Sequence, residues 1–514
     1  MKAVTALKKD GLLSLISGLL VGALLSGVSS GSFWAGLAGI GTFSAALVFG
    51  LLRVWRFFGN VRALAVVMIV AFFARVILGV FLLIGLQQFG FNNPIQDAGY
   101  AYSDAAKRDQ AAYQMALSGT SWLDSLKQSR SSDQYGGLLL VSAALYRVFS
   151  PDTHRPLLIV LLSAFSMTIG LAFLWDGVRK RWGSRMALAS AWVLALYPDG
   201  LMLGSSQMRE PLLIGLGCAA FWFCLLWKER RLLAGWVCLI LVVLACLISA
   251  PSGLAMMVVL TGIVFLEWAP QQPRLKTRVF GWTGFAVFLG LIGLAGWVWL
   301  RQTIYYESYL TQSSSGWIPM LFNSIGKIYQ IPFMAFYGVS QPFLPAALVD
   351  PSLPIWMAIA IFRALGWYLI LPFLLYGTFA LLNSEKRNGK AILIWFLCAF
   401  LIWIVVSSLR GGGDQWDNPR YRTIFLPWMA IIIAWVWERL PARKSSYFPC
   451  WVLVEVVFVL FFLNWYLYRN YNYGLMIPFF LMIKWIAGIS AAVFLGGFLF
   501  DVTRSLLRKK SGLR

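Results

Sequence analysis

Long apolar runs recur along the whole chain, and they constrain the fold more than any other feature of the sequence. Runs of roughly 17–25 residues match the length that a helix needs to cross the hydrocarbon layer of a membrane. Of the 514 residues, 60% are hydrophobic and only 12% are charged, and the mean hydropathy is +0.74. The sequence therefore predicts an all-α polytopic membrane protein built as one bundle of spanning helices.

The pattern of basic residues predicts how these helices are oriented. Lys and Arg gather in short loops between the apolar runs, as the positive-inside rule requires. The protein is therefore expected in the plasma (inner) membrane, with both termini on the cytoplasmic side. About fourteen spans result from this alternation. They are expected near residues 11–28, 34–53, 63–88, 157–176, 186–203, 210–227, 232–250, 252–268, 280–300, 356–382, 390–408, 423–438, 448–467 and 475–500.

Composition also excludes several classes of function. The net charge of +23 does not indicate nucleic-acid binding, because the basic residues lie in short loops between apolar runs, as in other membrane proteins. The six cysteines lie in or beside apolar runs, so no disulfide framework is expected. The single histidine, His154, excludes a histidine-cluster metal site. The first apolar run lacks a small-residue cleavage site, so no cleaved signal peptide is expected.

Four parts of the chain are expected from the alternation of spans and loops. They are an N-terminal transmembrane hairpin (1–62), a core (63–300) with a first outer loop (89–156), a second outer loop (301–355), and C-terminal helices (356–514) with a short outer loop (409–422). Within the first outer loop, the apolar piece 138–149 is too short to span. It is expected to lie at the interface or to re-enter the bundle.

The first outer loop concentrates carboxylates in a chain that has only 20 acidic residues. Its segment 103–119 is expected to form a helix, with Ser103 as the N-cap. Asp104 can pair with Arg108 four residues on, and Asp109 shares a face with Tyr113. The alternative is a solvated loop helix with internal ion pairs. Carboxylates just above a large bundle are well placed for base or metal chemistry, so Asp104 and Asp109 are the candidate catalytic residues.

The loop 409–422 is the second concentration of polar residues. Its consecutive glycines allow backbone N–H groups to approach an anion, and its arginines lie where a lipid phosphate would lie. The alternative is that these arginines only extend towards lipid headgroups. The candidate phosphate ligands are Arg410, Arg420 and Arg422, joined by Arg209 at the mouth of a span and by Arg363 near the outer end of another.

Aromatic and polar side chains in the outer loops suit the ring and hydroxyls of a sugar. Two outer segments share an Asp-Gln-aromatic pattern, Asp133-Gln134-Tyr135 and Asp414-Gln415-Trp416. The candidate sugar-binding or acceptor-binding residues are Tyr113, Asp133, Tyr135, Glu210, Asp414, Trp416, Asn418 and Tyr421.

The layout resembles the GT-C superfamily of integral-membrane glycosyltransferases, in the group of protein O-mannosyltransferases and lipid A aminoarabinose transferases. Asp109 is followed by Tyr113 and then by small residues at Ala116 and Gly119. Residues 195–198 read Ala-Leu-Tyr-Pro and lead through Ser205-Ser206 to Arg209-Glu210, and Arg420-Tyr421-Arg422 precedes Pro427. The resemblance covers about residues 63–270 well. Unlike the family, whose loop carboxylates are often adjacent, this chain has Asp104 and Asp109 five apart.

The resemblance implies transfer of a sugar from a polyprenyl-phosphate-linked donor to a lipid, glycan or protein acceptor on the extracytoplasmic side. A divalent cation, Mg²⁺ or Mn²⁺, is left open, with Asp104 and Asp109 as its ligands. A related alternative is a polysaccharide polymerase or an O-antigen-ligase-like enzyme. An alternative of a different class is a transporter or flippase for a lipid-linked glycan, which would need ionisable groups near mid-bilayer and repeat-related halves.

Overall fold

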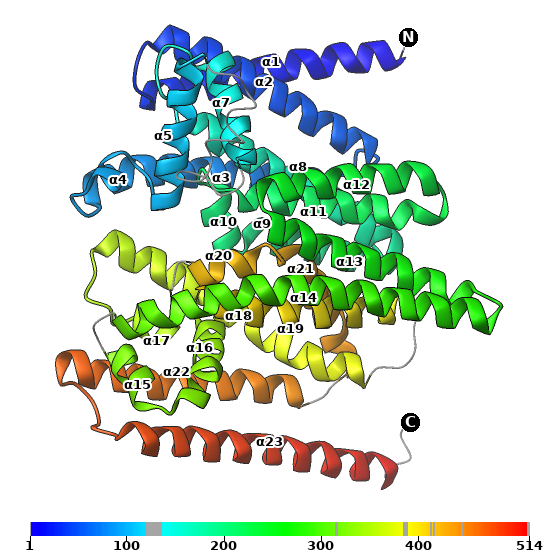
Figure 1. The fold of residues 1–514 in the computed structure, drawn as a ribbon, viewed down its shortest axis with the longest axis vertical. Helices are drawn as coiled ribbons and strands as arrows, with labels where there is room; N and C mark the ends of the chain where they lie inside the picture. Colours follow the sequence, from blue (N-terminus) through cyan, green and yellow to red (C-terminus); the bar gives the residue numbers. More distant parts are fainter. Residues whose placement is uncertain are drawn as a thin grey trace. The chain divides into compact units, whose positions relative to one another are not determined.

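The computed structural model of the protein describes residues 2–119, 136–313, 317–383, 389–411, 414, 417–443 and 446–510 (Figure 1). In this part of the chain, 12 helices are long and apolar enough to cross a membrane, or up to 14 if each of two bent helix pairs is one span. The predicted all-α polytopic membrane fold is confirmed.

The structure divides into two compact units. Unit 1 comprises Met1–Thr303 and Arg420–Ala430, and unit 2 comprises Ile304–Pro419 and Ile431–Arg514. Arg420–Ala430 therefore packs with the N-terminal helices, although the sequence places it among the C-terminal spans. This short return of the chain carries Arg420 into unit 1.

Unit 1 holds most of the early helices. These are α1 (Lys2–Val28), α2 (Phe33–Phe57), α3 (Arg62–Phe89), α4 (Pro94–Asp97), α5 (Ser103–Leu117), α7 (Gly137–Phe149), α8 (Leu157–Trp182), α9 (Ser184–Leu196), α10 (Pro198–Gly204), α11 (Glu210–Leu225), α12 (Arg231–Ile248) and α13 (Ala250–Trp268), with the 3₁₀ turns η1 (Leu226–Lys228) and η2 (Ala269–Gln271). Three helices cross a unit boundary, namely α14 (Leu275–Ser313), α20 (Asp417–Thr423) and α21 (Leu426–Arg443).

Unit 2 contains the remaining helices, in which α16 packs against α19, and α22 packs against α18 and α23. Its helices are α15 (Trp317–Ser324), α16 (Lys327–Ser340), α17 (Leu344–Ala347), α18 (Pro354–Leu382), α19 (Lys390–Gly411), α22 (Tyr447–Tyr471) and α23 (Phe479–Lys510). The expected second outer loop, 301–355, is thus largely helical in its described part, because α14 continues to Ser313 and three short helices follow.

Helix α8 is the centre of unit 1. It packs against α2, α3, α9 and α11, and most of its side chains are buried. Helix α3 has an exposed apolar face. Its side chains Ile69, Phe73, Ile77 and Phe81 recur every four residues, and all four are exposed. Residues four apart lie on the same side of a helix. On a spanning helix, an exposed apolar side is the one expected to face lipid.

The predicted span 186–203 is a broken helix. Helices α9 and α10 are bent by 58° at Tyr197. Pro198 has no N–H to donate to the Leu194 carbonyl four residues earlier, so this carbonyl needs another partner. Arg75 of α3 supplies it, because its Nη2 lies 2.9 Å from the Leu194 oxygen. After the bend, the turn before α11 lies next to α5, where Arg108 Nη1 donates to the Gln207 carbonyl at 3.4 Å.

Helices α1 and α2 form a tight antiparallel hairpin (Figure 1). Gly22 and Gly41 face each other, and a Cβ added at Gly22 would lie 2.5 Å from the Gly41 Cα. Small residues at a crossing point allow two membrane helices to approach closely. The hairpin expected at residues 1–62 is therefore held by backbone proximity.

Enlarging this contact should loosen the hairpin. We expect Gly22→Ala to lower the free energy of unfolding by about 1–3 kcal/mol, because the added methyl group forces two backbones apart. Thermal unfolding of the purified protein in detergent measures this. The matched control is Gly27→Ala on the same helix, where no atom lies within 4 Å of the added Cβ. Equal stability of the two variants would contradict the close approach.

Candidate active site

Helix α5 carries both candidate catalytic aspartates and packs against α7. It spans Ser103–Leu117, close to the predicted 103–119, but its N-cap is Tyr102, so the expectation of Ser103 as the cap is wrong. At 3.6 residues per turn, the five-residue spacing of Asp104 and Asp109 separates their side chains by about 140° around the helix. The two carboxylates consequently belong to different clusters.

Asp104 pairs with an arginine from the far end of the sequence. Arg420 Nη1 lies 3.2 Å from Asp104 Oδ2, and the Asp104 side chain is 51% exposed while that of Arg420 is 4% exposed. The expected partner, Arg108, instead donates from Nη1 to the Gln207 carbonyl at 3.4 Å. The two polar segments that the sequence singled out therefore meet, at Asp104 and Arg420.

Arg420 also contacts a fully buried carboxylate. Its Nε lies 3.2 Å from Glu210 Oε1, and Arg209 Nε lies 3.8 Å from the same oxygen. Glu210 is 0% exposed, and neither of its oxygens accepts a hydrogen bond from the described residues. Arg420 Nη2 further donates to the Tyr421 hydroxyl at 3.1 Å. We call Asp104, Arg209, Glu210, Arg420 and Tyr421 the Arg420 cluster.

Local sequence places the members of this cluster. Glu210 begins α11 with Pro211 directly after it, and the first turn of a helix favours both a carboxylate and a proline. Arg420 lies on the short helix α20, which meets α21 at a bend of 72°. The charged residues of the cluster thus all lie near the ends of helices or at a bend between two helices.

The electrostatics of Asp104 follow from its neighbours. Burial raises the pKa of Asp104, but the charge and hydrogen bond of Arg420, with the charges of Arg108 and Arg209, outweigh this and hold the pKa below its ordinary value. Asp104 is thus ionised at neutral pH. With Arg108 next to the cluster, three arginines act on Asp104, and this positive charge suits an anion.

Asp109 lies in a separate buried cluster. Its Oδ2 accepts hydrogen bonds from the Tyr100 hydroxyl at 2.7 Å and contacts His154 Nε2 at 3.0 Å, and its Oδ1 accepts from the Tyr146 hydroxyl at 2.6 Å. Asp109 is 2% exposed. Burial and the negative charge of Asp109 raise the pKa of Tyr100 and of Tyr146, so both hydroxyls stay protonated donors. We call these four residues, with Tyr113, the Asp109 cluster.

Tyr113 joins this cluster through the histidine. The Tyr113 and His154 rings are stacked, with centroids 4.8 Å apart and planes at 20°. Asp109 and Tyr113, four residues apart on α5, therefore both contact the ring of His154. The sequence alone did not single out Tyr100, Tyr146 or His154. The one available signal was that His154 is the only histidine of the chain and follows the loop carboxylates.

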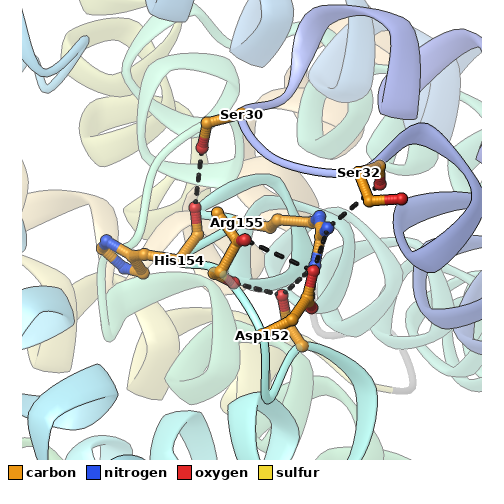
Figure 2. A network of polar contacts seen from close by, with 7 residues as sticks. Ser30, Ser32, Asp152, His154 and Arg155 are labelled. Atoms are coloured by element: carbon orange, nitrogen blue, oxygen red, sulfur yellow. Dashed lines mark hydrogen bonds and ion pairs between the residues drawn. The ribbon is translucent and has the colours of Figure 1, made fainter.

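Residues 150–156, which we call the strap, connect α7 to α8 and carry His154. Arg155, 1% exposed, donates to Asp152 through Nη1 and Nη2 and reaches Ser150 Oγ and the Ser32 carbonyl (Figure 2). The hydrogen bonds from Arg155 lower the pKa of Asp152 to about 2. Ser30 Oγ donates to the His154 carbonyl at 3.2 Å (Figure 2). The turn of the α1–α2 hairpin therefore braces the strap.

Gly31 makes this docking possible. Its φ of +88° is in the region that favours glycine, and an added Cβ would lie 2.5 Å from Thr153 Oγ1. The N-terminal hairpin is thus attached to the segment that holds His154.

The other candidate residues lie elsewhere. Arg422 is fully buried and hydrogen-bonded to Tyr197, which itself donates to Asp199 at 3.2 Å. Four candidates belong to unit 2, where Arg363, Arg410 and Asn418 are buried and Asp414 accepts from the Asp417 N–H at 2.7 Å. Asp133, Tyr135 and Trp416 lie outside the described residues.

A cation held jointly by Asp104 and Asp109 does not fit this geometry. The two carboxylates face different sides of α5, and both oxygens of Asp109 are engaged by protein donors. Among the residues that the structure describes, no three His, Cys, Asp or Glu side chains gather in a metal-binding group.

Comparison with known proteins gives a distant likeness. No protein-family model and no curated protein matches the chain. Among solved structures, the chain is similar to the archaeal oligosaccharyltransferase AglB from Archaeoglobus fulgidus, in complex with an inhibitory peptide and a dolichol-phosphate. The TM-score is 0.37 and the identity 14%, over 86% of this chain and 56% of that chain.

The apo form of an oligosaccharyltransferase from the same organism matches with a TM-score of 0.36 and 12% identity, over 84% of this chain and 55% of that chain. The protein thus spans little more than half the length of the chains it matches. TM-scores this low carry no inference about the reaction, so the geometry of the site must carry it.

Proposed function

We propose that the protein is a membrane glycosyltransferase that transfers a sugar from a polyprenyl-phosphate-linked donor to an acceptor on the extracytoplasmic side of the plasma membrane. The observation that supports this most is the Arg420 cluster, in which a buried guanidinium lies between a buried carboxylate and a half-exposed one. The GT-C resemblance of the sequence and the many apolar helices agree with a lipid-linked donor.

The cluster suits the leaving group of such a transfer. The bond between the anomeric carbon and a phosphate oxygen breaks, and negative charge accumulates on the polyprenyl phosphate. Arg420 offers a planar fork that matches phosphate oxygens, and Arg209 adds a second positive charge. Glu210 holds both arginines in place, so they need little reorganisation when the charge develops.

Asp104 has the exposure that a contact with the acceptor requires. Its carboxylate is ionised and half exposed, so it can accept a hydrogen bond from an acceptor hydroxyl or amine beside the donor phosphate. Asp109 is enclosed by two tyrosine hydroxyls that donate to it and by the His154 ring, and it suits an orienting role. Asp104 therefore positions the acceptor, and the arginines bind the donor.

Neutralising Asp104 tests this assignment. We expect Asp104→Asn to lower the transfer rate about 10–100-fold, because a charged hydrogen bond is worth about 1.5–3 kcal/mol. The readout is transfer of radiolabelled sugar from undecaprenyl-phosphate mannose, glucose or aminoarabinose in proteoliposomes. Asp97→Asn, an exposed carboxylate of the same loop, is the matched control and should keep the full rate. Full activity of Asp104→Asn would show that Asp104 does not position the acceptor.

The same proteoliposomes separate the classes of function. A glycosyltransferase consumes the lipid-linked sugar only when an acceptor is present. Movement of the lipid-linked sugar across the bilayer without acceptor, and without sugar transfer, would overturn the proposal in favour of a flippase.

A further inference from the structure

Helices α11, α12 and α13 enclose an apolar cavity of about 240 Å³ that the proposed transfer does not use. From α12 it is lined by Gly235, Leu239 and Val242, and from α13 by Leu260 and Val264. These positions recur every three or four residues, so one side of each helix faces the cavity. An apolar cavity of about 150 Å³ already binds benzene, so this one has room for a segment of hydrocarbon chain.

The cavity opens on an exposed face of α12. Leu239 lines it and is 51% exposed, and a Cβ added at Gly235 would meet no atom within 4 Å. Further apolar residues of α12 are exposed, Trp236 and Ile240 among them. On a spanning helix, exposed apolar side chains are expected to contact lipid. A lipid chain can therefore enter the cavity from the bilayer.

A polar rim borders one end of the cavity. Trp227 lines the cavity and belongs to η1, at the turn that joins α11 to α12. The backbone N–H of Arg230 donates to the Leu226 carbonyl at 3.0 Å, so the turn is tight, and its basic residues are Lys228, Arg230 and Arg231. Tryptophan, lysine and arginine are the residues that anchor a spanning helix at the level of the lipid headgroups. This is consequently the headgroup end of the cavity.

Ion pairs hold this rim together. Glu267 follows the cavity-lining Val264 by one turn of α13. Its Oε1 lies 3.1 Å from Arg181 Nη2, and its Oε2 lies 3.3 Å from Lys228 Nζ. The Glu267 side chain is only 10% exposed. This carboxylate therefore links α8, α13 and the turn after α11 at the end of the cavity where Trp227 lies.

The rim keeps an excess of positive charge. Arg230 and Arg231 are exposed, and among the residues that the structure describes neither forms an ion pair. Even when Glu229 of the turn is counted with Glu267, four basic side chains stand against two carboxylates. Basic pockets between membrane helices bind anionic lipid headgroups. An apolar cavity that ends in uncompensated arginines therefore matches a molecule with a hydrocarbon chain and an anionic head.

We propose that this cavity binds an anionic phospholipid of the bilayer, with an acyl chain between α12 and α13 and the phosphate at Arg230 and Arg231. The basic turn assigns this lipid to the cytoplasmic leaflet. Glu210 begins α11 and the cavity-lining Cys224 is near its end, which places the two about 20 Å apart along the helix axis. The lipid site is thus separate from the Arg420 cluster, and it does not depend on the proposed function.

Native mass spectrometry of the whole chain in detergent measures this binding. Phosphatidylglycerol, phosphatidylcholine and glycerol 3-phosphate are each titrated into the purified protein. We expect a phosphatidylglycerol adduct at concentrations where the other two give none, because phosphatidylcholine lacks the net charge and glycerol 3-phosphate lacks the acyl chains. Absence of the phosphatidylglycerol adduct, or equal binding of either of the other two compounds, would overturn the inference.

A charge variant tests the headgroup end. We expect Arg230→Gln/Arg231→Gln to weaken phosphatidylglycerol binding about 30-fold, because each basic residue beside an anionic lipid surface contributes roughly fivefold. Arg274→Gln/Arg278→Gln removes the same charge from the exposed start of α14 and should leave the binding unchanged. If both double variants weaken the binding equally, the lipid responds to the surface charge as a whole, and the proposed site is refuted.

A second variant tests the cavity itself. Gly235→Trp places a large side chain at the opening of the cavity and should abolish the phosphatidylglycerol adduct. The matched control is Gly284→Trp on α14, where an added Cβ likewise meets no atom within 4 Å. Phosphatidylglycerol should raise the melting temperature of the wild type and of Gly284→Trp but not that of Gly235→Trp, and equal melting temperatures without lipid show that the fold is kept. Unchanged binding by Gly235→Trp would show that the chain does not occupy the cavity, against the proposal.

Discussion

Replacing Arg420 with glutamine should abolish detectable binding of undecaprenyl phosphate and slow sugar transfer by about 100–1,000-fold, the cost of removing one preorganised donor to a developing anion. Arg420 pairs with both carboxylates of its cluster, Asp104 and Glu210. Arg420→Lys should recover little, because an ammonium keeps the charge but loses the planar fork. Binding of radiolabelled undecaprenyl phosphate and transfer in proteoliposomes measure both effects.

Loss of folding has to be separated from loss of function here. Arg420→Gln removes the nearest cation from the buried Glu210, and breaking a buried ion pair costs about 3–5 kcal/mol. The double variant Arg420→Gln/Glu210→Gln removes both charges, so we expect it to regain most of the stability and none of the binding. Arg62→Gln, an exposed arginine of α3, is the control for charge. Wild-type binding by the double variant would contradict an Arg420 phosphate site.

Asp109→Ala should produce a large loss of stability in unit 1. It leaves the buried hydroxyls of Tyr100 and Tyr146 without their acceptor, and each unsatisfied buried donor costs about 1–3 kcal/mol. We therefore expect the free energy of unfolding to fall by about 2–6 kcal/mol. Thermal unfolding in detergent measures this against Asp97→Ala in the same loop.

A compensating variant shows whether hydrogen bonding is the cause. Removing both partners of a buried hydrogen bond can be nearly neutral, so adding Tyr100→Phe and Tyr146→Phe to Asp109→Ala should restore much of the stability. If Asp109→Ala is as stable as the wild type, the Asp109 cluster does not hold α5, α7 and the strap together.

The sequence predicted the spans well, because the length and apolar character of a spanning helix are local properties. The pieces 63–88 and 157–176 correspond to α3 and to most of α8. The short piece 138–149 corresponds to α7, and its position at the interface or re-entering the bundle stays a prediction. The break at Tyr197 was not predicted, because the apolar run continues through Pro198 and only its missing N–H signals the bend.

Site residues were harder to predict because their contacts are not local. The expected pairing of Asp104 with Arg108 follows helix spacing, but Asp104 bonds Arg420, 316 residues away. Asp109 and Tyr113 have the expected spacing, and yet what lies between them is the His154 ring, which arrives from the strap beyond α7. No periodicity in the sequence records which distant segment will reach a given helix face.

By itself, the sequence determined that this is a polytopic helical membrane protein whose carboxylates gather in one loop and whose arginines gather in another. Those are consequences of hydrophobicity and composition, which act wherever the residue stands in the chain. Only the tertiary structure decided that Asp104 meets Arg420 and Glu210, and that Asp109 meets Tyr100, Tyr146 and His154. A buried charge is stable only beside its partners, and packing brings those partners together from distant parts of the chain.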